Sequence, residues 1–99
     1  MIRHIVMFQF KEFETIEAKQ AKLEELKQGL IDLVGKVPTL LKMEVGINCN
    51  PAEKYDLTLI SEFESLEALE AYAVHPDHVA VGAKIKEIMQ ARACVDYQF

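Results

Sequence analysis

Apolar residues along this chain of 99 residues follow two periods, and the changes from one period to the other mark the expected elements. Residues 2–10 are rich in β-branched and aromatic side chains, which predicts a strand. Both the even and the odd positions of this segment are largely apolar. That pattern is typical of a strand in the middle of a sheet that is covered on both sides.

Helical spacing begins after Thr15, whose hydroxyl can cap a first helical turn. Gly35 and Pro38 are typical of a helix end, so we expect the helix to run to about Val34. Within it, apolar side chains recur every three or four positions, with Glu and Lys on the opposite side: Ile16, Leu23, Leu26, Leu30, Leu33 and Val34.

Alternation of apolar and polar residues returns in the next part of the chain and predicts strands at about 40–48 and 55–63. Helical segments are expected at 66–73 and from 76 to about 90, because Ser65 and Pro76 are favourable at the start of a helix. Alternation over 91–98 predicts the last strand.

The resulting order, β-α-β-β-α-β, predicts a ferredoxin-like α+β fold, with a four-stranded antiparallel sheet and the helices on one face. The length allows a single domain, residues 1–99. The more uniformly apolar face of the sheet is expected under the helices: Leu41, Met43, Val45, Leu57, Leu59 and Val95. The other face is expected to hold Arg3, Ile5, Met7, Gln9, Lys42, Glu44, Thr58, Ile60, Arg92, Cys94 and Asp96.

That second face would carry apolar residues at its centre and charges of both signs at its rim, which is typical of a self-complementary interface. The composition agrees with this interpretation, because 51% of the residues are hydrophobic in a chain too short to bury them all. We therefore expect a homodimer that forms through the sheet faces.

The charges and cysteines exclude some classes of function. A net charge of −5 argues against nucleic-acid binding, and the excess lies in one stretch with no base, expected to be solvated: Glu62, Glu64, Glu67 and Glu70. Two cysteines, Cys49 and Cys94, make no disulfide framework, which favours free thiols in a reducing compartment. No apolar run is long enough for a membrane helix, and no leader precedes the first strand, so we expect a cytoplasmic protein.

The candidate chemistry involves all three histidines. If the even positions of the first strand face the helices, His4 and Phe8 lie near the point where the chain passes from one helix to the next. There the sequence holds Tyr72, His75 and His78. A position in the first turn of a helix disfavours the imidazolium form of His78, and Tyr72 could polarise a carbonyl, so the two make a candidate acid/base pair.

Structural roles remain open for the same side chains. His75 before Pro76 can simply cap the helix, and Tyr72 can bury its ring in the core. A metal site at His75 and His78 is not expected, because Pro76 breaks the helical register and no carboxylate or cysteine cluster completes the ligands. No nucleotide-binding, serine-hydrolase or zinc-protease motif is present, so we expect no cofactor.

At this point the sequence resembles the stress-responsive dimeric A/B barrel (Dabb) domain family over essentially its whole length. The resemblance lies in the segments at residues 2–8, 43–46, 55–57 and 95–97, and in the Tyr-x-x-His-Pro-x-His motif at 72–78. It implies a homodimeric α+β barrel with ferredoxin-like protomers. One plant branch of the family is a polyketide cyclase that performs a cofactor-free aldol condensation, and its catalytic Tyr and His fall on Tyr72 and His78.

The resemblance also implies that His4 lines the pocket of that branch, and we expect His4, Phe8 and His75 as ligand-binding residues. Three functions remain open at this stage. The first is cofactor-free acid/base chemistry on a small carbonyl compound, in an apolar pocket between the sheet and the helices. The others are a non-catalytic ligand-binding or stress-response module and a cofactor-free monooxygenase.

Overall fold

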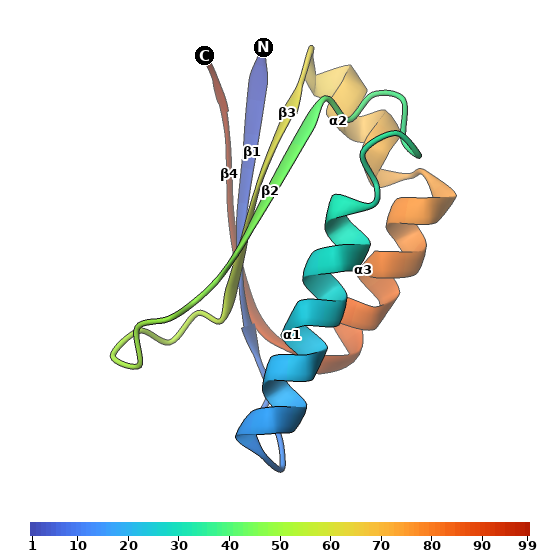
Figure 1. Ribbon diagram of the computed structural model, residues 1–99. Helices are drawn as coiled ribbons and strands as arrows, with labels where there is room; N and C mark the ends of the chain where they lie inside the picture. The colour runs from blue at the N-terminus through green and yellow to red at the C-terminus, as the bar shows by residue number, and fades with distance from the viewer.

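The computed structural model describes residues 1–99 (Figure 1) and contains four strands and three helices: β1 (Ile2–Phe10), α1 (Ile16–Ile31), β2 (Lys42–Ile47), β3 (Leu57–Phe63), α2 (Leu66–Ala73), α3 (Pro76–Ile88) and β4 (Met89–Gln98). The strands form one antiparallel sheet in the order β2-β3-β1-β4. All three helices cover the same face of the sheet (Figure 1), which confirms the predicted ferredoxin-like α+β fold.

Strand β1 lies inside the sheet, as its two apolar faces predict. It pairs with β3 along one side, from Ile2 opposite Phe63 to Phe8 opposite Leu57. It pairs with β4 along the other side, with a register shift between Gln9 and Phe10. The long central strand therefore fixes how both neighbours present their side chains.

Each helix begins at a side-chain cap. The hydroxyls of Thr15 and Ser65 accept hydrogen bonds from the backbone N–H groups of Ala18 and Ala68. Helix α3 begins after His75, whose Nδ1 accepts from the N–H of Asp77 at 3.1 Å. These bonds satisfy donors that the first helical turn leaves free.

Helix α1 ends at Ile31, earlier than the expected Val34. The following residues form turns, in which Gly35 has a φ of 91°, a left-handed conformation that glycine adopts without strain. This bend buries Leu33 and Val37 and leaves Val34 exposed. The spacing of apolar residues predicted a longer helix because Leu33, in the turn after the helix, also packs into the core.

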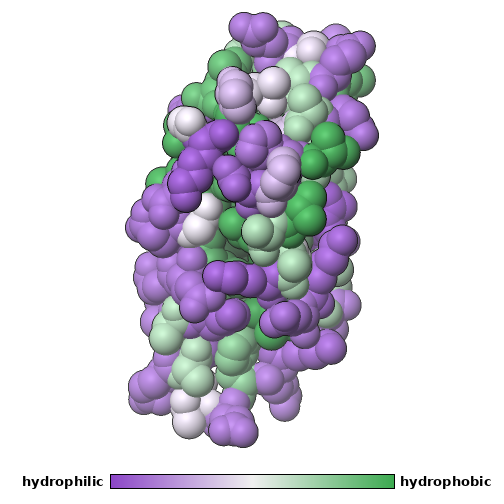
Figure 2. Space-filling model, turned by 90° about the vertical axis from the view of Figure 1, so that its right-hand side faces the viewer, coloured by the Kyte–Doolittle hydropathy of each residue, from purple (hydrophilic) through white to green (hydrophobic).

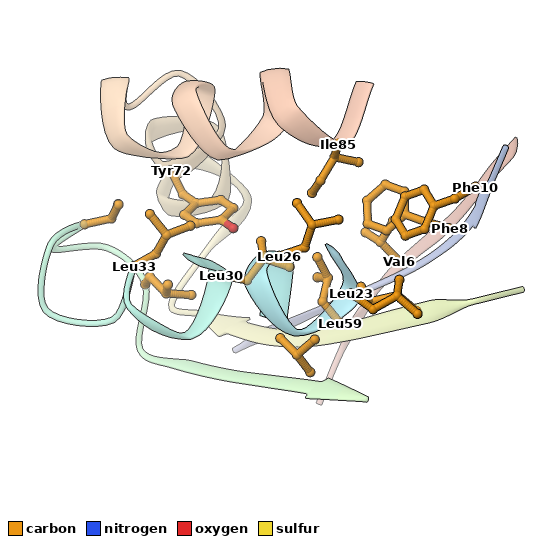
Figure 3. Packing of buried hydrophobic residues seen from close by; sticks show 14 of the residues in the cluster. Val6, Phe8, Phe10, Leu23, Leu26, Leu30, Leu33, Leu59, Tyr72 and Ile85 are labelled. Carbon is orange, nitrogen blue, oxygen red and sulfur yellow. The ribbon is translucent and has the colours of Figure 1, made fainter. Parts of the chain in front are cut away.

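The core lies between the sheet and the helices (Figure 3). Leu23, Leu26 and Leu30 point inward from α1, and Phe63 and Tyr72 pack against each other with ring centroids 5.1 Å apart. By contrast, the outer surface of the helical layer is mostly hydrophilic, with scattered apolar residues (Figure 2). None of the helices has both the length and the apolar character that a membrane span requires.

The prediction for the faces of the last strand was wrong. Cys94 is the partner of Val6 and Asp96 is the partner of His4, and paired residues of an antiparallel ladder point to the same face. Arg92, Cys94 and Asp96 therefore lie on the helix side. Val95, opposite Ile5, lies on the other side and is 54% exposed.

The physical reason is the position of β4 at the edge of the sheet, where neither face is well covered. The alternation of apolar residues therefore does not identify the core face, and the register with β1 does. Leu41 also lies outside its predicted place, because it precedes β2 and is 45% exposed.

The acidic stretch is less uniform than expected. Glu62 is half-buried on β3 and forms an ion pair with Arg3, at 3.1 Å between Oε2 and Nη2. The other three acids of the stretch, Glu64, Glu67 and Glu70, are exposed. The solvated patch therefore covers α2 and the turn before it, and Glu62 anchors the first strand.

Candidate active site

A cavity of about 290 Å³ lies between β1 and the helices. Four of the predicted site residues line it: His4 and Phe8 from β1, Tyr72 from α2 and His78 from α3. Its other lining residues are Val6, Leu30, Leu59, Gly82, Ile85, Lys86, Met89 and Arg92. We call it the helix-side cavity.

Tyr72 is the most buried polar group of this cavity, with 2% of its surface exposed. Its hydroxyl oxygen points toward the interior (Figure 3) and has no hydrogen-bond partner in the protein. Burial raises the pKa of Tyr72, so the phenol stays protonated at neutral pH. A buried hydroxyl without a partner is costly, and it is ready to donate to a ligand oxygen.

His78 lies directly beside Tyr72, with ring centroids 4.3 Å apart. Its Nδ1 is 3.0 Å from the carbonyl oxygen of Ala73. Because a carbonyl only accepts, Nδ1 must carry the proton, which leaves Nε2 of the neutral ring as an acceptor. Burial is the main cause that lowers the pKa of His78, and the nearby charges of His4 and Lys86 lower it further. A neutral imidazole with a free nitrogen has the form of a general base.

His4 is fixed from the neighbouring strand. Its Nδ1 is 2.5 Å from Oδ1 of Asp96 and 3.6 Å from Sγ of Cys94. Because the carboxylate accepts from Nδ1, the ring of His4 is held in one orientation at the wall of the cavity. Burial, followed by the charge of Asp96, raises the pKa of the Cys94 thiol, so Cys94 lacks the features of a reactive thiolate.

The same three side chains have the donor types that Zn²⁺ prefers, and their donor atoms lie within 4.8 Å of one another. Zinc–ligand distances of about 2.0–2.2 Å place the N and O ligands of a tetrahedral ion roughly 3.3 Å apart. The His4–Asp96 distance of 2.5 Å is instead that of a hydrogen bond. In this arrangement Asp96 therefore positions His4, and a metal would need the carboxylate to move.

His75 does not line the helix-side cavity. Its ring nitrogen caps α3, and its Nδ1 is 3.9 Å from a carboxylate oxygen of Asp77. The geometry thus shows His75 in its structural role, as the cap of α3. His75 contributes to the cavity only through its charge, which lowers the pKa of His78 slightly.

Sequence reasoning missed Gly82, Lys86, Arg92 and Asp96. Arg92 and Asp96 were placed on the wrong face, since only the β1–β4 register puts them beside Phe8 and His4. Gly82 and Lys86 could have been found from helical spacing, because they follow His78 by four and eight residues on α3. That spacing places all three on one side of the helix.

A second hollow, of about 490 Å³, lies on the other side of the sheet. We call it the open-face hollow. It is bounded by Met7, Thr58 and the end of the β2–β3 hairpin, including Gly46, Cys49 and Tyr55. It contains no histidine, and the acid/base pair lies wholly on the helix side.

The stress responsive A/B barrel domain (Dabb) matches residues 2–99. Olivetolic acid cyclase from Cannabis sativa is 26% identical over 97% of this chain and 94% of its own length. The stress-response A/B barrel domain-containing protein DABB1 from Arabidopsis thaliana is 27% identical, and this chain spans 46% of it.

Solved structures agree on the fold. A dimeric protein of unknown function with a ferredoxin-like fold, from Bacteroides fragilis, has a TM-score of 0.92 and 39% identity, with 99% of this chain and 95% of that chain covered. A dimeric ferredoxin-like protein from Thermobifida fusca has a TM-score of 0.83 and 26% identity, with 99% and 90% covered. A hydroxynitrile lyase from Passiflora edulis, at 16% identity and a TM-score of 0.80 over 97% of this chain and 90% of that chain, shares the fold.

Proposed function

Since the chain belongs to the stress responsive A/B barrel (Dabb) domain family, we propose that it catalyses cofactor-free acid/base chemistry on a small carbonyl compound in the helix-side cavity. One observation carries this proposal. The buried hydroxyl of Tyr72 has no partner, and the neutral ring of His78 lies beside it with Nε2 free. The similarity to a cyclase supports the same class of reaction.

The chemistry follows from the protonation states. Nε2 of His78 takes a proton from the carbon next to a carbonyl group, and Tyr72 donates a hydrogen bond to the oxygen where negative charge develops. The enolate carbon then attacks a second carbonyl group of the same molecule to form a carbon–carbon bond. The proton on His78 passes to the new alkoxide, so no oxidant or cofactor is needed. His4, held by Asp96, orients the ligand.

Proton exchange tests this mechanism without knowledge of the natural substrate. In D₂O, the protein should catalyse loss of the α-proton signals of aryl ketones, measured by NMR. His78→Gln should lower the rate about a hundredfold or more, and Tyr72→Phe roughly tenfold to a hundredfold. His75→Gln, which changes a histidine outside the cavity, is the matched control and should retain the exchange rate.

Equal rates in the wild-type and His78→Gln proteins would contradict the proposal. Binding of ketones without any exchange would instead favour the alternative, a non-catalytic ligand-binding or stress-response module; DABB1 is by name a stress-response domain-containing protein. Oxygen consumption with a phenolic compound would identify the third function, a monooxygenase.

We also propose that the protein forms a homodimer through the open face of the sheet. On this face Met7 of β1 is 39% exposed and Val95 of the edge strand β4 is 54% exposed, and Ile5 of β1 is the ladder partner of Val95. Similar proteins of known structure are dimeric. Light scattering at micromolar concentration should give twice the monomer mass, and a monomeric mass would contradict the dimer.

We also propose that the protein is located in the cytoplasm, because of the state of its cysteines. Cys49 and Cys94 are both free and exposed, which is typical of a reducing compartment. Fractionation of cells that express the tagged protein tests this location, and recovery in an oxidising compartment would contradict it.

A further inference from the structure

The helix-side cavity has two chemically different ends. Tyr72 lies at one end of the core cluster and Phe8 at the other (Figure 3). On β1, His4 and Phe8 are separated by four residues, or about 13 Å of strand. On α3, His78 and Lys86 are separated by eight residues, or about 12 Å of helix. The spacing along β1 and the spacing along α3 therefore both indicate one elongated cavity, with Tyr72 and His78 at one end.

The far end carries two cations. Lys86 reaches it from α3, and Arg92 reaches it from β4, where Arg92 is the partner of Phe8. The ion pairs of the molecule involve other residues, and no carboxylate lines the cavity. Both side chains are exposed at the rim of the cavity, where Arg92 also acts on the Cys94 thiol, and neither has an acidic partner in the protein.

A neighbouring lysine shows the contrast. Lys84 lies on the same helix but does not line the cavity. The pKa of Glu25 on α1 is lowered mainly by its hydrogen bond to Lys22, and the charge of Lys84 adds the smallest contribution. Lys84 therefore lies on the side of α3 near α1, whereas Lys86 and Arg92 line the cavity. An acidic group on a ligand is the partner that these two side chains lack.

The wall of the helix-side cavity between its two ends is apolar, and it leaves space at Gly82. Ile85 and Met89 line it from α3, and Val6 lines it from β1. Gly82 leaves space, because a Cβ atom built there would have no other atom within 4 Å. A short chain of methylene groups could lie along this wall.

We propose that the helix-side cavity selects carbonyl compounds that also carry an acidic group, with the acid bound by Lys86 and Arg92 and the carbonyl at Tyr72 and His78. A few methylene groups over Gly82 separate the two. The placement of the carbonyl rests on the proposed function, but the binding of the acid does not. The substrate class is therefore a small, elongated keto acid.

Calorimetric titration of the full chain, at a salt concentration of about 0.15 M to screen distant charges, tests this proposal. The probes are 3-benzoylpropionate, which joins a ketone to a carboxylate through two methylene groups, and its uncharged amide. The carboxylate should bind at least about tenfold more tightly. Lys86→Met and Arg92→Met should each weaken the carboxylate about tenfold and leave the amide unchanged, and Lys84→Met should change neither.

Equal affinities for the acid and the amide would overturn the proposal. It would also be overturned if Lys84→Met weakened binding as much as Lys86→Met, or if neither probe bound at millimolar concentration. The two proposals fail separately. Loss of α-proton exchange with retained preference for the acid removes the acid/base chemistry alone, whereas exchange without any preference removes only the keto-acid specificity.

Discussion

The helix-side cavity and the open-face hollow lie on opposite sides of the same strands, at about 290 and 490 Å³. The larger one is a surface depression between the hairpin and β1. The smaller one is covered by α3, and it holds a buried hydroxyl and an imidazole whose pKa values burial has shifted in opposite directions. Cover by helices, rather than volume, therefore creates the conditions for chemistry, because it removes water from the polar groups.

The two hollows also differ in what completes them. The helix-side cavity is formed by residues of this chain alone, and a small ligand is the occupant that we propose for it. The open face exposes apolar side chains over several strands, and a second copy of the chain is the partner that we propose for it. The charge variant and the two glycine variants below each change one side of the sheet.

The largest effect is expected from a charge on the open face. Met7→Glu places an unpaired carboxylate at the middle of the proposed interface, which should cost roughly 3 kcal/mol or more and weaken the dimer over a hundredfold. Light scattering measures the mass, and calorimetry measures ligand binding. Lys36→Glu, on the turn after α1, is the control for added charge. A Met7→Glu protein that remains dimeric at nanomolar concentration would place the interface elsewhere.

Each hollow contains one glycine, which provides a matched pair of variants. Gly82→Leu has open space for its side chain and should fill the helix-side cavity. Ligand affinity should fall at least about tenfold, while the free energy of unfolding should stay equal or rise by up to about 1 kcal/mol, since leucine favours helix over glycine. Titration and urea denaturation measure the two quantities.

Gly46→Leu is the partner of this pair. A Cβ atom at residue 46 would lie 3.3 Å from Cγ2 of Thr58, so the Thr58 side chain must move by a few tenths of an ångström to accept a larger residue. We expect a loss of about 1–3 kcal/mol in the free energy of unfolding, without loss of ligand binding. If Gly46→Leu abolished binding and Gly82→Leu did not, the ligand would bind on the open face.

A smaller effect is expected from pH. Folding lowers the pKa of His78 below its ordinary value of 6.5, so the unfolded chain binds more protons between the two pKa values. The stability from neutral His78 is present above pH 6.5 and is lost as pH falls through the lowered pKa. Urea denaturation of the wild-type and His78→Gln proteins should show a weaker pH dependence below pH 6.5 in the variant. An identical slope would mean that His78 titrates as in the unfolded chain.

The smallest effect concerns Cys94. Asp96 helps to raise the pKa of its thiol, so Asp96→Asn should increase the thiolate fraction and the rate of alkylation at pH 7.5 several-fold. A Cys49→Ser background isolates this signal from the exposed second cysteine. Alkylation followed by mass spectrometry gives the rate, and a slower reaction would mean that Asp96 acts mainly by another contact.

The sequence predicted one strand of the cavity wall correctly and the other wrongly. In β1 both sets of alternate positions are largely apolar, and the even set with His4 and Phe8 faces the helices as expected. In β4 apolar residues do alternate with polar ones, but the apolar residues lie on the open face of the sheet. Which face of an edge strand is buried depends on whether solvent or a second copy of the chain covers it. The residue pattern of one strand does not contain that information.

The same reason explains which site residues were found. Tyr72 and His78 lie in a short motif, and local spacing was enough to bring them together. Arg92 and Asp96 reach the cavity only through pairing with residues more than eighty positions earlier, and a register of that range cannot be read from alternation. The role of His75 as a cap was one of two local possibilities, and only the distance to Asp77 decides between them.

The place of β1 at the centre of the sheet has a consequence for synthesis on the ribosome. Of the described elements β1 is made first, yet one of its two partners is β4, the last of them to be made. Until residues 89–98 are released, β1 has an unpaired edge of apolar residues that can associate with other nascent chains. The wall that carries His4 thus becomes complete only when β4 has been made, and we expect a fragment that ends before β4 to aggregate.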